Sequence, residues 1–283
     1  MDANAGTVPA RPAGRPVRKD EIVIEERGLY IESWLPERRS RRKPLYLLHG
    51  ELGGSWLWER YLLYFAQRGW EGHALNLRGH FWSENVDLET TSLDDYVEDA
   101  LAGYDALGRP GVVVGHGLGA LLALRVAEQR EAHGMVLIAP ALPRPIRPEP
   151  PPHVVRLVPP RFRRELLGWA GAVEQIRRQN PDLTVRDVMR IQHLMGAGSG
   201  LARRQMLEGI PVDRDAIGGI PALVLGGGQD RLFAEAECER LAEWLGGAYQ
   251  PYGAHSHYGL VIGEESHLQV AEAIRTFLDH HRL

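Results

Sequence analysis

The sequence has a single cysteine among its 283 residues, and this scarcity excludes two kinds of site. Cys238 can form neither an intramolecular disulfide nor a metal site built from several cysteines. It lies in a helical pattern, where we expect it to be an ordinary packing residue. No apolar run approaches the roughly 20 residues that cross a bilayer, and the N-terminus lacks the apolar core of a secretory signal. We therefore expect a cytoplasmic protein with no membrane span.

Excess charge of one sign is also missing, since 33 Lys and Arg stand against 37 Asp and Glu, for a net charge of -4. This balance gives no reason to expect nucleic acid as a partner. A G-x-x-x-x-G-K-[ST] phosphate loop is absent, and Gly226-Gly227-Gly228 lacks the G-x-G-x-x-G pattern of dinucleotide binding. The histidine pairs 255/257 and 280/281 have no third ligand at convincing spacing. We expect no cofactor and no metal.

The composition is that of a globular chain, with 44% hydrophobic and 25% charged residues, and it suits one large domain with an insertion. Residues 1–20 are rich in Ala, Gly, Pro and Arg and lack apolar periodicity, so we expect a flexible tail or leader there. We interpret the basic run from Arg38 to Lys43 as a solvated surface turn in preference to a phosphate-binding site.

Short apolar runs alternate with helical patterns of roughly ten to fifteen residues between residues 45 and 138. This alternation predicts βαβ units and a mostly parallel sheet with an α/β architecture. Two leading strands, 21–25 and 29–35, have no helix between them and are expected to form an antiparallel hairpin at the edge. The sheet is expected to resume at 221–226, with a last strand at 248–251 and a closing helix over 266–280.

Eight prolines between Pro143 and Pro160 argue against a helix or a central strand in that stretch. The pattern from about 161 to 208 is helical, and we interpret it as a cap inserted between two strands of the sheet. The predicted organisation is a tail over 1–20, a core domain formed by 21–142 and 209–283, and a helical cap over 143–208 with a proline-rich lead-in.

The most informative stretch runs from Gly111 to Ala120, where a β-branched run ends in a glycine-rich corner and a helical pattern begins. Strand, tight turn and helix form the context of a nucleophile elbow, whose pattern is G-x-S-x-G. The stretch reads Gly115-His116-Gly117-Leu118-Gly119, so a glycine occupies the nucleophile position. We do not expect His116 to replace the nucleophile, because a flanking side chain in an elbow points away from the pocket.

Four further landmarks accompany the elbow, and together they resemble the α/β-hydrolase superfamily with a helical cap, over residues 20 to 283. They are His49-Gly50 after the third strand, Arg78-Gly79-His80 after the fourth, Asp230 after the penultimate strand and His257 after the last. The order nucleophile, acid, histidine is the one that this fold uses. The resemblance implies a mostly parallel, eight-stranded type of sheet with helices on both faces and an inserted cap.

The resemblance also implies a site. Asp230 would orient His257, with His255 as the second choice, and the backbone N–H groups of Glu51 and Leu118 would form an oxyanion hole. Asp230 could instead be a turn or N-cap residue. Gly117 can neither attack nor hold a covalent intermediate, yet it adopts a positive φ without the roughly 1–3 kcal/mol that a side chain costs there. The expected pocket residues, each of which could also be plain packing, are His49, Gly50, Trp56, Trp82, His116, Trp169, His193 and Met195.

Two functions stay open from the sequence. The first is an enzyme that acts on an ester, thioester or other carbonyl compound, in which His257 and Asp230 activate a water or abstract a substrate proton. If Gly117 replaces a serine, whether by evolution or by an experimenter, the parent is an ordinary serine hydrolase. The second is a non-catalytic protein that binds an apolar small molecule or meets a partner through its cap. The intact Asp230 and His257 favour the first, and the missing nucleophile favours the second.

Overall fold

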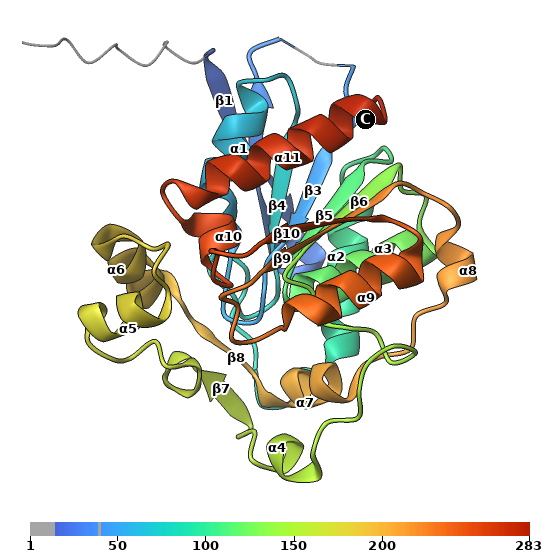
Figure 1. The fold of residues 1–283 in the computed structure, drawn as a ribbon. Helices are drawn as coiled ribbons and strands as arrows, with labels where there is room; N and C mark the ends of the chain where they lie inside the picture. The colour runs from blue at the N-terminus through green and yellow to red at the C-terminus, as the bar shows by residue number, and fades with distance from the viewer. Residues whose placement is uncertain (1–14, 39–40) are drawn as a thin grey trace, which may run out of the picture.

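The computed structural model describes residues 15–38 and 41–283 and contains an eight-stranded sheet (Figure 1). The strand order is β1-β2-β4-β3-β5-β6-β9-β10; β1 pairs antiparallel with β2, β2 antiparallel with β4, and the others pair in parallel. The mostly parallel sheet and the edge hairpin are thus confirmed. The strands are β1 (Val17–Ile24), β2 (Leu29–Pro36), β3 (Leu45–Leu48), β4 (Gly72–Asn76), β5 (Val112–His116), β6 (Gly134–Ile138), β9 (Ala222–Gly227) and β10 (Ala248–Tyr252).

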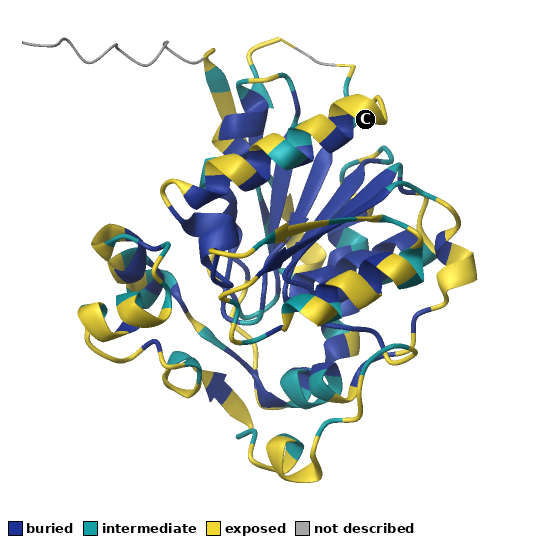
Figure 2. Ribbon diagram, viewed as in Figure 1, coloured by how far each residue is buried: buried dark blue, intermediate teal, exposed yellow. Residues whose placement is uncertain are grey.

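Helices cover both faces of the sheet, which is why the central strands read as continuous apolar runs. Along β5, Val112 and Val114 face one buried cluster and Val113 faces the other. Figure 2 shows these strands buried almost throughout. The first face carries η2 (Ser55–Trp58), α1 (Glu59–Ala66), α10 (Gly259–Ile262) and α11 (Ser266–His280). The second carries α2 (Leu93–Asp105), α3 (Leu118–Gln129), α8 (Arg214–Ile217) and α9 (Glu235–Leu245).

Between β6 and β9 the chain leaves these layers and forms a separate group of elements (Figure 1). These are α4 (Pro152–Arg156), β7 (Arg161–Arg163), η3 (Arg164–Leu167), α5 (Val173–Gln179), α6 (Val185–Leu194), β8 (Ala197–Ser199) and α7 (Gly200–Glu208). We call residues 143–208 the cap. No helix in the described ranges combines the length and the apolarity that crossing a bilayer requires.

Two features of the cap differ from the sequence prediction. The proline-rich stretch contains α4, because Pro152 stands at the helix N-terminus, where a missing N–H breaks no helical hydrogen bond. The stretch predicted as wholly helical contains β7 and β8, which pair antiparallel from Arg161–Ser199 to Arg163–Ala197. Helical periodicity does not register strands of three residues whose partners lie more than thirty residues away in sequence.

The N-terminal prediction needs a correction. Residues 1–14 of the expected tail lie outside the described residues, but β1 already begins at Val17. The backbone of 17–20 pairs with that of 33–36, so this part of the chain belongs to the sheet in spite of its polar composition. In the basic run, residues 39 and 40 are not described, and Arg42 forms an ion pair with Asp279.

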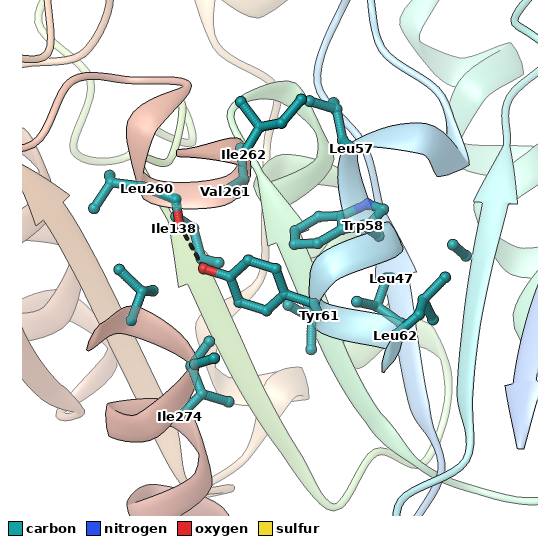
Figure 3. Packing of buried hydrophobic residues seen from close by; sticks show 14 of the residues in the cluster. Leu47, Leu57, Trp58, Tyr61, Leu62, Ile138, Leu260, Val261, Ile262 and Ile274 are labelled. Atoms are coloured by element: carbon teal, nitrogen blue, oxygen red, sulfur yellow. Dashed lines mark hydrogen bonds between the residues drawn. The ribbon is translucent and has the colours of Figure 1, made fainter. Parts of the chain in front are cut away.

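The segment 256–264, which follows β10 and which we call the histidine segment, is held from two sides. From the cap, Asp182 accepts a hydrogen bond from the Ser256 N–H at 2.9 Å, and Asp187 accepts one from the Glu264 N–H at 3.1 Å. From the core, the Tyr61 hydroxyl donates to the Leu260 carbonyl beneath α10 (Figure 3). These bonds fix the backbone on both sides of the predicted site histidine.

Candidate active site

The elbow between β5 and α3 is built from three glycines with two different roles. A Cβ at Gly115 would lie 2.3 Å from the Gly119 carbonyl oxygen, and a Cβ at Gly119 would lie 2.2 Å from the Leu48 carbonyl oxygen. Neither position has space for a side chain, because strand and helix pack backbone against backbone there. Gly117 lies between them with φ 56° and ψ -118°, at the N-cap of α3.

Gly117 differs from its neighbours because a side chain would fit there. A Cβ at this position would lie 3.4 Å from His257 Cε1, 3.5 Å from His257 Nε2 and 3.7 Å from Phe233 Cε2, which are ordinary contact distances. The cost of a side chain is therefore the positive φ and not a steric clash. The glycine therefore removes a reactive hydroxyl from this position, although the surrounding side chains leave space for one.

His257 and Asp230 form a hydrogen-bonded pair, with 2.8 Å between Nδ1 and Oδ2. The Asp230 side chain is fully buried, and its Oδ1 accepts hydrogen bonds from the N–H groups of Leu232 and Phe233 at 2.7 and 3.0 Å. These three bonds satisfy an ionised carboxylate, which can only accept. The proton of neutral His257 therefore resides on Nδ1, and Nε2, directed towards Gly117, is left as a base.

His255, the second choice, has a different environment. Its ring stacks on Tyr252 with 5.1 Å between centroids, and neither ring nitrogen has a hydrogen-bond partner. Burial lowers the pKa of His255. Of the two histidines, His257 is the one that contacts Asp230.

Two peptide groups offer unused donors at the predicted oxyanion hole. Within the described part of the chain, the N–H groups of Glu51 and Leu118 have no hydrogen-bond acceptor. The plane of the Gly50–Glu51 peptide is fixed because the Gly50 carbonyl accepts a hydrogen bond from His49 Nδ1 at 2.7 Å. The next peptide along the chain, Glu51–Leu52, is also held, because its Glu51 carbonyl is hydrogen-bonded to His80 Nε2 at 2.9 Å.

His116 lies behind the pair and does not line the pocket. Its ring is fully buried and stacks on the His257 ring with 4.2 Å between centroids. Nε2 donates to the His257 carbonyl at 3.2 Å, and burial, reinforced by the neighbouring His257, lowers the pKa of His116 well below its usual value. A neutral His116 thus packs against the His257 ring and does not line the cavity.

A cavity of about 420 Å³ opens onto His257, between the cap and the core. This volume is within the range of small-molecule sites. The lining residues are Leu166, Leu167, Gly168, Trp169, Gln179, Asn180, Arg203, Arg231, Leu232, His257 and Tyr258. The wall is apolar on the side of the leucines and Trp169, and it also carries two arginines.

Of the expected pocket residues, only Trp169 lies in this wall. Trp56 and Met195 are buried in the core cluster of the first face, and His193 is exposed on α6. Trp82 is 65% exposed and packs on Phe81. Helical spacing places a residue on a segment but does not say which way a loop side chain turns, and this explains the misplacements. The other three, His49, Gly50 and His116, are buried behind the site.

The sequence analysis missed the residues that give the cavity its polarity. Arg231 and Tyr258 each directly follow a predicted site residue, so adjacency to Asp230 and His257 was the available signal. Arg203 reaches the cavity from α7 and carried no such signal. In the described ranges, no three His, Cys, Asp or Glu side chains gather closely enough to hold a metal ion.

The buried His49 makes stability depend on pH. Burial, with a smaller contribution from His80, lowers the pKa of His49 to about 3, against about 6.5 in an unfolded chain. Between about pH 6.5 and 3, His49 is therefore protonated in the unfolded chain but not in the folded chain. Above that pH, neutral His49 does not lower the free energy of unfolding. As the pH falls from about 6.5 towards 3, proton binding to the unfolded chain lowers the free energy of unfolding by up to ~1.4 kcal/mol per pH unit.

We expect His49→Asn to reduce the dependence of the free energy of unfolding on pH. The asparagine amide can still donate a hydrogen bond to the Gly50 carbonyl. Urea unfolding at several values between about pH 6 and 4 should show a slope smaller by up to ~1.4 kcal/mol per unit than in the parent. The exposed His153→Asn is the control and should keep the parent's slope. If both variants keep it, His49 titrates normally in the folded chain.

Comparison with known proteins gives the following matches. Residues 45–273 match the model of the alpha/beta hydrolase family. No curated protein matches the chain. The bromoperoxidase from Bacillus anthracis has a similar structure, with a TM-score of 0.70 at 15% identity, covering 93% of this chain and 100% of that one.

Two more structures are similar at comparable identity. A thermophilic esterase from Thermogutta terrifontis gives a TM-score of 0.68 at 19% identity, over 94% of this chain and 100% of that chain. A monoacylglycerol lipase from Paleococcus ferrophilus gives a TM-score of 0.66 at 20% identity, over 89% of this chain and 99% of that chain. Such identities show the fold alone.

Proposed function

The chain belongs to the alpha/beta hydrolase family, and from this premise we propose that it acts on a small molecule with an ester, thioester or similar carbonyl group. The observation that carries the proposal is the His257–Asp230 hydrogen bond of 2.8 Å, placed beside the space that a side chain at Gly117 would fill. A base that is oriented by a buried carboxylate and faces a cavity is the arrangement that proton transfer requires.

The proposed reaction needs no covalent intermediate. A water in the space above Gly117 gives a proton to His257 Nε2 and attacks the carbonyl carbon. The N–H groups of Glu51 and Leu118 stabilise the oxyanion, and Asp230 stabilises the imidazolium. When the carbon–oxygen or carbon–sulfur bond of the leaving group breaks, His257 returns the proton to that group, and the acid is released. For a substrate with an acidic proton next to its carbonyl, the same base would remove that proton.

Among the possible carbonyl substrates we favour esters, because structures of similar fold are named as an esterase and a lipase. The second candidate is a binding protein without turnover, and it is favoured by the glycine at the nucleophile position. Both candidates use the same cavity. They differ in whether His257 transfers a proton.

Hydrolysis of p-nitrophenyl butyrate by the chain and by His257→Ala separates the two candidates. Loss of a general base should lower kcat/KM by about 10²- to 10⁴-fold. The exposed His280→Ala is the control and should retain the parent's kcat/KM. Equal turnover by the parent and His257→Ala would exclude the proposed mechanism. If the parent does not exceed buffer, the binding protein is favoured.

A further inference from the structure

The cavity beside His257 has an unbalanced charge. Two of its lining residues, Arg203 and Arg231, carry guanidinium groups, and none of its lining residues is acidic. Arg203 is already compensated, because it forms an ion pair with Glu51 at 2.5 Å and lies over the Phe162 ring. Arg231 has no hydrogen-bond or ion-pair partner among the residues that the structure describes. The cavity therefore offers about one free positive charge.

The position of Arg231 is set by the same turn that holds the site carboxylate. Asp230 directs Oδ2 to His257 and uses Oδ1 to accept from Leu232 and Phe233, so the backbone on both sides of Arg231 is fixed. The buried Asp230 carboxylate is fully engaged in these bonds and directed at His257. Arg231 is exposed and lines the same cavity as His257.

The opposite wall comes from the cap and supplies two further kinds of contact. Leu166, Leu167 and Trp169 present apolar surface, and Gln179 presents a side-chain amide at the end of α5. Apolar walls with a few directed polar groups are typical of small-molecule sites, in which the polar groups fix the orientation of the ligand. A ligand that suits this cavity has an apolar middle and an anionic end.

We propose that the substrate carries a carboxylate several bonds from its reactive carbonyl and that Arg231 binds this carboxylate. The inference rests on the proposed function, because it takes the carbonyl at His257 as the other end of the ligand. A guanidinium matches a carboxylate through two parallel hydrogen bonds. One free positive charge also balances a carboxylate better than a phosphate monoester, which carries about -1.5 to -2 near neutral pH.

Binding tests the inference without turnover. The probes are glutaric acid monoanilide and valeranilide, two amides of equal chain length that differ by one carboxylate, and each is titrated into the chain by calorimetry. The carboxylate probe should bind about tenfold tighter or more, and the difference should shrink in high salt. Arg231→Gln should abolish the preference. Arg178→Gln, which removes the same charge from an exposed position on α5, should preserve it.

Turnover separates this inference from the function on which it rests. In a Gly117→Ser background, we expect Arg231→Gln to raise KM for the p-nitrophenyl monoester of glutaric acid about tenfold, with little change for p-nitrophenyl valerate. If neither ester is hydrolysed but the binding preference persists, the proposed function fails, while the assignment of Arg231 as the residue that binds a ligand carboxylate is supported. If both probes bind equally to the parent, or if Arg231→Gln keeps the preference, the inference is overturned.

Discussion

Gly117→Ser should convert this chain into an ester hydrolase with an acyl-enzyme intermediate, raising kcat/KM by roughly 10⁴-fold or more. The Cβ of the new side chain would lie 3.5 Å from His257 Nε2, so its hydroxyl can reach that nitrogen. Asp230 already holds His257 in the tautomer that accepts a proton. The N–H groups of Glu51 and Leu118 would bind the oxyanion as before. Only the nucleophile is added.

Hydrolysis of p-nitrophenyl esters and labelling by a fluorophosphonate measure this gain. Gly117→Ala is the matched control, since it introduces the same Cβ at φ 56° without a hydroxyl. Both variants should lose about 1–3 kcal/mol of unfolding free energy, because a side chain is strained at positive φ. Only the serine variant should hydrolyse the ester rapidly and become labelled. A folded serine variant that is neither active nor labelled would show that another part of the site is missing.

Asp230→Asn in the Gly117→Ser background should then lower kcat by roughly 10⁴-fold. The asparagine oxygen can still accept from the N–H groups of Leu232 and Phe233, and this places its NH₂ group against His257 Nδ1. A donor at that place favours the tautomer with the proton on Nε2, which cannot accept the serine proton. KM should change little, because Asp230 does not line the cavity.

Steady-state kinetics of the double variant check this expectation. Asp213→Asn in the same background is the control, since Asp213 also accepts backbone N–H groups at a helix start, that of α8, and lies outside the cavity. Its kcat should remain within about threefold of the background, as is usual for a surface substitution. A loss in Asp230→Asn no larger than in Asp213→Asn would mean that the carboxylate does not control the His257 tautomer.

The sheet could be predicted from the sequence because its signals are local. The central strands, such as β5 and β6, read as short apolar runs, and the glycines at 115 and 119 mark the close approach of strand and helix. The order of Asp230 and His257 after successive strands identified them as a candidate pair before any distance was known. Proteins of this architecture keep such residues at the carboxyl ends of parallel strands, where loops converge.

The cavity wall could not be predicted in the same way, because it depends on side-chain direction and on the packing of the cap. Trp82 was predicted as a pocket residue and is exposed, whereas Arg231, for which the sequence predicted no role, lines the cavity. The β7–β8 pair was missed because its partners are distant in sequence and only three residues long. Such features follow from tertiary contacts, which override local patterns.

The attachment of the cap to the histidine segment links two processes. Asp182 and Asp187 hold the N–H groups of Ser256 and Glu264, so displacement of α5 and α6 from the core breaks the bonds on either side of His257. Opening of these helices and alignment of the base are thus thermodynamically coupled: a ligand that stabilises the closed cap also favours the aligned imidazole, and alignment of the imidazole favours the closed cap by the same coupling free energy. A ligand that binds preferentially to the closed cap therefore also increases the population of molecules in which His257 is aligned for proton transfer.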